Sequence, residues 1–248
     1  TLVADAPFEG VENGKVSWGD YDKDGDMDLA LMGSASTGTI TNVYKNNDGS
    51  FVNTNQNFNK FIGGDIEFVD VNQDGWLDLF VTNFSGESNT LYINDKSGSF
   101  VDQTFLAGLG QPSLNYLGFG TKFIDLNYDG YQDIFVANGH VIDNIQHFNK
   151  GYTHAQKKQI FLGDGFASFT EVSSDEIGDA KTPSVGRGAA FGDLDNDGDQ
   201  DVVINCLNAP ALVYENISQR ARVAVRLRGR PGNTRGVGAR ISLIEAAF

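Results

Sequence analysis

Four nine-residue segments of this chain repeat one pattern of oxygen-bearing side chains. They cover residues 20–28, 70–78, 125–133 and 193–201, and each has Asp at positions 1, 5 and 9, Asp or Asn at position 3, and Gly at position 6. Clustered carboxylate and amide oxygens are ligands for a hard divalent cation. Glycine at position 6 permits a sharp turn, because it adopts positive φ at little cost. The chemistry offered by this pattern is metal binding in a tight loop.

Calcium is the ion that fits these acidic loops best. It takes six to eight oxygen ligands at about 2.3–2.6 Å, whereas magnesium demands a small, strict octahedron and retains its waters. Asp, Asn and Gly also form ordinary turns, but four copies in register favour calcium. Positions 1, 3 and 5 offer side-chain oxygens, position 7 a backbone carbonyl, and position 9 a carboxylate placed to bind with both oxygens. We predict about four calcium ions, one per loop, with these ligands: Asp20, Asp22, Asp24, Asp26, Asp28, Asp70, Asn72, Asp74, Trp76, Asp78, Asp125, Asn127, Asp129, Tyr131, Asp133, Asp193, Asp195, Asp197, Asp199 and Asp201.

An EF-hand begins with the same residues but is excluded by position 12. That loop needs an acidic residue there, whereas the four loops carry the apolar residues Leu31, Val81, Val136 and Ile204. The residues that follow also have the apolar character of strands. Position 9 therefore closes a shorter loop that joins two strands.

Short apolar segments flank each loop in the same order. A strand ending in an aromatic residue precedes the loop, and two further strands follow it, at residues 29–32 and 42–45 in the first repeat. The first three repeats add a fourth strand centred on Phe51, Phe100 and Phe169. Four short strands in a repeat of about 50 residues form the unit of a propeller blade. The predicted fold is an all-β propeller over residues 1–219, with four blades that each carry an acidic loop.

Three parts of the chain depart from this regular repeat. Residues 138–158 form an insertion, in which we expect a helix around residues 154–158. Residues 1–11 resemble the outer strand of a blade, and the fourth repeat lacks an outer strand of its own. We expect the four blades to be part of a propeller with more blades. The alternative is a closed ring of four, with residues 1–8 completing the last blade.

Charge changes sign near residue 219. Residues 1–219 hold 11 basic and 32 acidic residues, whereas residues 220–248 hold seven Arg and only Glu245. Val223, Val225 and Leu227 alternate with polar residues, which indicates a half-buried strand. We predict that residues 220–248 begin a small C-terminal β domain. Its arginines could bind an anion, but docking against the acidic propeller is the simpler account.

Composition excludes several classes of protein. The net charge of −15 argues against nucleic acid as a partner, because a phosphate backbone requires a basic surface. Runs of about 18 apolar residues, which a membrane-spanning helix needs, are absent. Cys206 is the single cysteine, so the chain forms no internal disulfide. A signal peptide is not present in this chain.

Other residues could support chemistry but have simpler explanations. His140, His147 and His154 would need to converge from an irregular insertion to bind a transition metal, and loop histidines are the simpler explanation. Trp76, Tyr128 and Tyr131 could stack on a sugar or a partner, although exposed loop residues explain them equally well. Asp65 and Glu67 could act as a glycosidase-like pair. The sequons at Asn83 and Asn216 are easily matched by chance. Catalytic serine and zinc-protease motifs are absent from the sequence.

The loops and their lead-ins, such as Phe191-Gly192-Asp193, resemble FG-GAP/VCBS repeats of the kind found in integrin α-chain propellers. Residues 136–141, 185–199 and 236–241 are similar to the cartilage acidic protein family, whose members join such a propeller to an ASPIC/UnbV domain. The resemblance covers residues 14–241. It identifies residues 220–248 as a truncated ASPIC/UnbV-like segment, and the chain has fewer blades than propellers of the family usually have.

The resemblance implies a calcium-binding protein located outside the cell, in the periplasm or at the cell surface, with roles in adhesion and no established catalysis. Our leading hypothesis is a non-enzymatic, calcium-stabilised scaffold for protein interaction, or a subunit of a larger assembly. A carbohydrate-binding propeller is the second hypothesis. A lyase or hydrolase with its site in the insertion around His140 and His154 is the third. The partner, whether protein or glycan, is not encoded in any motif that we identify.

Overall fold

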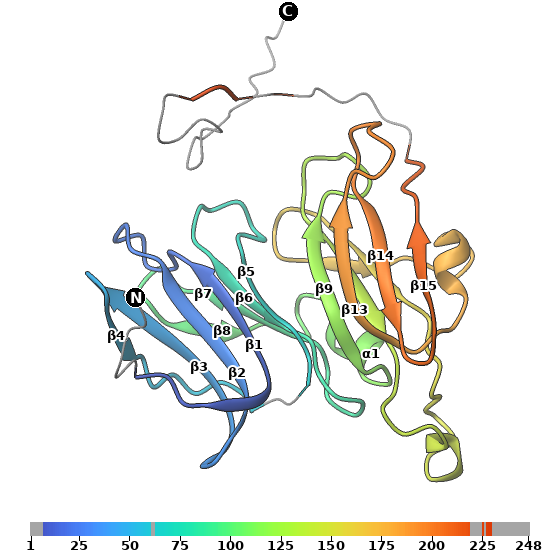
Figure 1. Cartoon of the computed structure of the whole chain (residues 1–248). Helices are drawn as coiled ribbons and strands as arrows, with labels where there is room; N and C mark the ends of the chain where they lie inside the picture. Colours follow the sequence, from blue (N-terminus) through green and yellow to red (C-terminus); the bar gives the residue numbers. More distant parts are fainter. Residues whose placement is uncertain (1–6, 61–62, 219–224, 226, 230–248) are drawn as a thin grey trace, which may run out of the picture.

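The computed structural model describes residues 7–60, 63–218, 225 and 227–229. Residues 1–6 and most of the predicted C-terminal segment 220–248, including the strand expected around Val223, lie outside the described residues. The described part is an all-β array of four sheets, which confirms the predicted propeller architecture (Figure 1). None of its helices has the length and apolar character needed to cross a membrane.

Each sheet is one blade, and its strands are antiparallel and adjacent in chain order. In the described residues, the first three blades have four strands and the fourth has three. The strands are β1 (Val11–Gly19), β2 (Asp28–Ala35), β3 (Gly38–Asn47) and β4 (Ser50–Asn53); β5 (Ile66–Val69), β6 (Asp78–Val81), β7 (Thr90–Asn94) and β8 (Phe100–Asp102); β9 (Gly118–Ile124), β10 (Asp133–Asn138), β11 (Gln159–Gly163) and β12 (Phe169–Glu171); and β13 (Gly186–Gly192), β14 (Asp201–Cys206) and β15 (Ala209–Tyr214). The short helix α1 (Gly110–Ser113) and two 3-10 turns (Ile145–His147 and Gly178–Lys181) lie in the connections.

The second strand of each blade is the most apolar because neighbouring blades cover both of its faces. All residues of β6 and β10 are buried, as are the first six of β2. A continuous apolar run of this length is the pattern of a fully buried strand. The first strands β1, β5, β9 and β13 lie side by side in chain order, and Figure 1 shows the first and fourth sheets at opposite ends of the array.

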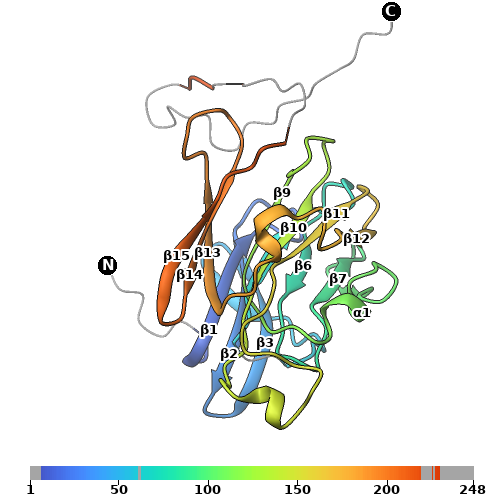
Figure 2. The ribbon, with the colours of Figure 1, turned by 90° about the vertical axis from the view of Figure 1, so that its right-hand side faces the viewer.

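The phenylalanine of each fourth strand packs against the preceding blade. Phe100 of β8 lies 5.5 Å, centroid to centroid, from Tyr21 of the first blade, within the apolar cluster that joins the first two blades. Phe169 of β12 lies 6.3 Å from Phe123 in the cluster that joins the second and third blades. The cluster between the third and fourth blades includes Phe135 and Val202 but has no such phenylalanine among its described members. Figure 2 shows the three-stranded fourth blade at the edge of the array.

Two expectations from the sequence are wrong. Residues 154–158 form no helix, because their backbone groups bond to another segment: Gln156 and Ser184 exchange two N–H···O=C hydrogen bonds, and the Lys158 N–H donates to the Ala180 carbonyl. Phe8 does not lie in the fourth blade, as the closed ring of four requires. It packs edge-on against Tyr44 and Phe51 of the first blade, at centroid distances of 5.1 and 5.0 Å.

Truncating a fourth-strand phenylalanine should destabilise the fold far more than truncating an exposed one nearby. Phe169 is 4% exposed, whereas Phe166, in the hairpin that leads to it, is 79% exposed. Phe169→Ala should lower the free energy of unfolding by about 3–5 kcal/mol, because it leaves a cavity between two blades. Phe166→Ala should change it by less than about 0.5 kcal/mol. Urea denaturation of both variants measures this, and equal losses would contradict the assigned packing.

Candidate metal centres

Each acidic loop connects the first strand of its blade to the second. The loops therefore lie at equivalent corners of the four blades, and the first three touch in sequence. The Lys23 ammonium of the first loop lies 4.8 Å from the ring centroid of Trp76 in the second. The Gln73 side-chain amide of the second loop donates to the Gly130 carbonyl of the third, at 2.8 Å. The predicted loops thus form a row along one face of the array.

All four loops have the same internal hydrogen bonds. The N–H of position 5 donates to the side-chain oxygen of position 3, that of position 6 to the carboxylate of position 1, and that of position 7 to the carboxylate of position 5. Position 4 has a left-handed backbone in every loop, with φ between 57° and 64°, and the glycine at position 6 has φ between 82° and 99°. The shared sequence pattern therefore produces one shared conformation.

The first and fourth loops gather three carboxylates each. One oxygen from each of Asp20, Asp22 and Asp24 lies within 4.8 Å of the others, and Asp193, Asp195 and Asp197 form the same arrangement. In the second and third loops, Asn72 and Asn127 replace the acid at position 3, so an amide oxygen takes the place of a carboxylate.

This donor set fits calcium. It consists entirely of oxygens, which a hard cation prefers. Moreover, Asp20 Oδ1 is buried and has no hydrogen-bond partner among the described residues. A buried oxygen without a partner is costly unless another group satisfies it. A cation held by the first loop would supply that partner.

Position 9 has a role that our sequence analysis did not include. Its aspartate is buried in every blade and accepts two backbone N–H bonds, one from position 2 and one from the third strand. In the second blade, the Val71 N–H donates to Asp78 Oδ2 at 3.1 Å and the Asn94 N–H to Oδ1 at 2.8 Å. The other blades repeat this arrangement at Asp28, Asp133 and Asp201. A carboxylate has about four lone-pair sites, so these bonds leave room for a metal ligand role.

Burial makes these carboxylates unusually basic. It raises the pKa of Asp28, Asp78 and Asp133 to about 6, and the neighbouring acids of each loop raise the pKa further. The backbone N–H donors act in the opposite direction, because they stabilise the charged form. Repulsion from the loop acids is the part that a bound cation would remove.

The side chains at position 7 already have contacts of their own. The Asp26 carboxylate accepts the Asp48 N–H at 2.7 Å, Trp76 lies beneath the Lys23 ammonium, and Tyr131 packs against Gly165. Stacking of a sugar on Trp76 would therefore compete with Lys23. This arrangement weakens the sequence argument for these aromatics as a carbohydrate platform.

The histidines of the insertion are not brought together as a metal site. His140 is fully buried, and in the described residues the metal-compatible clusters contain no histidine. Its Nδ1 accepts the Ile142 N–H at 3.0 Å, so Nε2 carries the proton and donates to Ser85 Oγ at 2.9 Å. Burial lowers the pKa of His140. In this tautomer, His140 does not act as a general base toward Ser85.

Two other sequence candidates have structural roles. Asn83 is fully buried and its side-chain amide donates to the Ser88 carbonyl and to Thr90 Oγ1, so it is not an accessible glycosylation site. The acids Asp65 and Glu67 each face a lysine: Lys15 Nζ lies 4.0 Å from Asp65, and the Nζ of a second lysine, Lys122, lies 2.6 Å from Glu67. These ion pairs join the first strands of neighbouring blades.

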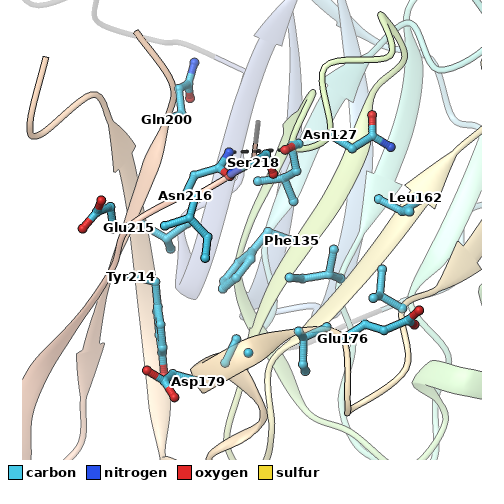
Figure 3. Close-up of a pocket in the computed structure, with 18 of the residues that line it drawn as sticks. Asn127, Phe135, Leu162, Glu176, Asp179, Gln200, Tyr214, Glu215, Asn216 and Ser218 are labelled. Carbon is cyan, nitrogen blue, oxygen red and sulfur yellow. Dashed lines mark hydrogen bonds between the residues drawn. The ribbon is translucent and has the colours of Figure 1, made fainter. Parts of the chain in front are cut away.

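A groove of about 670 Å³ separates the third and fourth blades (Figure 3). Its floor is apolar, with Phe135 and Ile177 among the lining residues, and Glu176, Asp179 and Glu215 add acidic groups. The groove lies in the third blade interface, which has no fourth-strand phenylalanine among the described residues. The sequence signal for it was the absence of a fourth-strand Phe after residue 215.

The fold and its loops define a repeat propeller, and the chain belongs to the family of FG-GAP-like repeats. The family model matches residues 20–81, 70–136 and 125–204. Integrin alpha-3 of Cricetulus griseus is 34% identical over 118 residues, which are 42% of this chain and 11% of that protein. Integrin alpha-3 of Mus musculus is 33% identical over 128 residues, 44% of this chain and 12% of that protein. The match thus spans roughly a tenth of these relatives.

A solved structure of a lectin from Agrocybe aegerita, described as recognising non-reducing terminal N-acetylglucosamine, also aligns with the chain. It is 16% identical, with a TM-score of 0.35, over 82% of this chain and 66% of that chain. At this level the likeness carries no functional argument.

Removing the position 9 carboxylate should destabilise a blade even without metal. Asp133→Ala leaves the buried N–H groups of Leu126 and Gly163 without acceptors, each at a cost of about 1–3 kcal/mol. We expect a loss of at least about 2 kcal/mol in thermal or urea unfolding with excess chelator. Asp129→Asn in the same loop is the matched control, because its side-chain oxygen still accepts the Tyr131 N–H. If both variants unfolded like the parent, the bracing role of Asp133 would be wrong.

Proposed function

We propose that this chain is a calcium-binding propeller that acts outside the cell as a scaffold for protein interaction. The observation that carries the calcium proposal is the shared geometry of the four loops, which gathers oxygens at positions 1, 3 and 5 around one point in each of the first and fourth loops. The FG-GAP family match and the partial similarity to integrin alpha-3 support an interaction role. The finer likeness to the cartilage acidic protein family is part of this proposal.

In each loop, positions 1, 3 and 5 would hold the ion with side-chain oxygens, position 7 with its carbonyl and position 9 with its carboxylate. Bound calcium would supply positive charge where several carboxylates converge. Two carboxylates at 4 Å repel by about 4 kcal/mol at an effective dielectric of 20. Neutralising this repulsion would fix the loop between the first and second strands, so each ion would stiffen one corner of one blade.

Calcium should bind with a stoichiometry of about four and raise the melting temperature. Each site held at a calcium concentration 100 times its Kd should add about 2.7 kcal/mol to the stability. Isothermal titration calorimetry and thermal unfolding measure both quantities, with magnesium as the control ion. The combined variant Asp20→Asn, Asp70→Asn, Asp125→Asn and Asp193→Asn should lose the response. No calcium heat and an unchanged melting temperature in chelator would refute calcium binding.

The scaffold proposal predicts calcium-dependent attachment to a protein rather than to a glycan. The immobilised chain should retain cells of its source organism in calcium and release them in chelator. Retention should fall when surface proteins are removed by proteolysis and persist after enzymatic removal of glycans. The opposite pattern, together with a loss of binding for Trp76→Ala, would favour the carbohydrate-binding hypothesis. Substrate turnover that His140→Ala abolishes would favour the enzyme hypothesis.

A further inference from the structure

The third strand of each blade places one residue beside its acidic loop, and this residue differs in charge among the blades. The residues are equivalent by register, because each follows an aromatic that pairs with the residue after position 9, as Tyr44 pairs with Leu29 and Tyr214 with Val202. In chain order the equivalent residues are Lys45, Ile93, Leu162 and Glu215. The charge at this position therefore runs from positive in the first blade to negative in the fourth.

Lys45 is directed at the first acidic loop. Its Nζ contacts Asp22 Oδ2 and lies 3.1 Å from Asp24 Oδ2. These two carboxylates, at positions 3 and 5, belong to the same cluster as Asp20. The lysine thus places a positive charge on the acids that would hold a cation, and like charges at this range repel.

The fourth loop is a matched comparison within the same chain. Like the first loop, it has Asp at positions 1, 3, 5, 7 and 9, and its first three acids cluster in the same way. Glu215 occupies the register position of Lys45, so that position carries a negative charge instead of a positive one. Lys23 at position 4 of the first loop is a second difference, but its ammonium is directed at Trp76 of the neighbouring loop.

The second loop has an intermediate arrangement. Ile93 is uncharged at the register position, but Lys96, in the hairpin after β7, lies 3.1 Å from Asp74 Oδ2 at position 5. It therefore makes one lysine contact with the loop where Lys45 makes two.

From this arrangement we infer that the register residue of the third strand grades the calcium affinity of the four sites, with the first site weaker than the fourth because of Lys45. The inference rests on the proposed calcium function and extends it to unequal sites. The first site would fill only at a higher calcium concentration. The four blades would then stiffen in stages rather than together.

Glycine amides give a separate readout for each loop. The Gly25 N–H donates to Asp20 Oδ2, and the Gly198 N–H donates to Asp193 Oδ2. Nuclear magnetic resonance of the full chain labelled with 15N-glycine can therefore follow calcium at the first and fourth loops in one titration. We expect the Gly198 signal to respond at a lower calcium concentration than the Gly25 signal.

Two reciprocal variants test the role of charge. Lys45→Met should lower the Gly25 midpoint by roughly three- to tenfold, the range for a partly exposed charge acting on a divalent ion, and leave the Gly198 midpoint unchanged. Glu215→Lys should raise the Gly198 midpoint by a similar factor and leave Gly25 unchanged. Lys157→Met is the control, because that lysine pairs with Glu171 away from the loops. The calcium-free spectra report whether each variant folds.

The possible failures are distinguishable. If no glycine signal responds to calcium, the proposed function itself is wrong. If the signals respond but Gly25 is the first to move, or if Lys45→Met leaves its midpoint in place, the grading inference is overturned and calcium binding stands.

Discussion

The structure depends on a buried carboxylate at the corner of each blade. The aspartate at position 9 lies where the second strand begins, and its two oxygens accept N–H groups from the start of the loop and from the third strand. A buried charge is tolerable only when hydrogen bonds compensate it. This requirement fixes the loop and two strands relative to one another. The same conformation recurs in four blades because the same acceptor is present in each.

The proposed metal chemistry is built on this corner. Once position 9 holds the loop, the Asx-type hydrogen bonds from positions 1, 3 and 5 turn the remaining acids toward a common point. The structural and the metal-binding functions therefore use the same nine residues in different ways. Position 9 mainly braces the blade, whereas positions 1, 3 and 5 create the repulsion that a cation would relieve.

The sequence allowed the strands, the loops and their order to be predicted, because apolar runs and the nine-residue pattern repeat in register. It did not reveal the bracing role of Asp78, since the third-strand donor Asn94 lies 16 residues away and contributes only a backbone N–H. The helix expected at residues 154–158 was wrong because Gln156 and Ser184 pair across the insertion. Lys45 was likewise missed, because its contact with Asp22 exists only once β2 and β3 are paired.

The fourth-strand phenylalanines have a consequence for how such a chain changes in evolution. Phe100 and Phe169 each complete the interface with the preceding blade by the same type of contact. A duplicated blade therefore brings with it the side chain needed to join its neighbour, and repeats can be gained or lost as whole units. Single strands cannot be exchanged so freely, since removing one opens an interface. The groove beside Phe135 marks the place where such an exchange would be felt first.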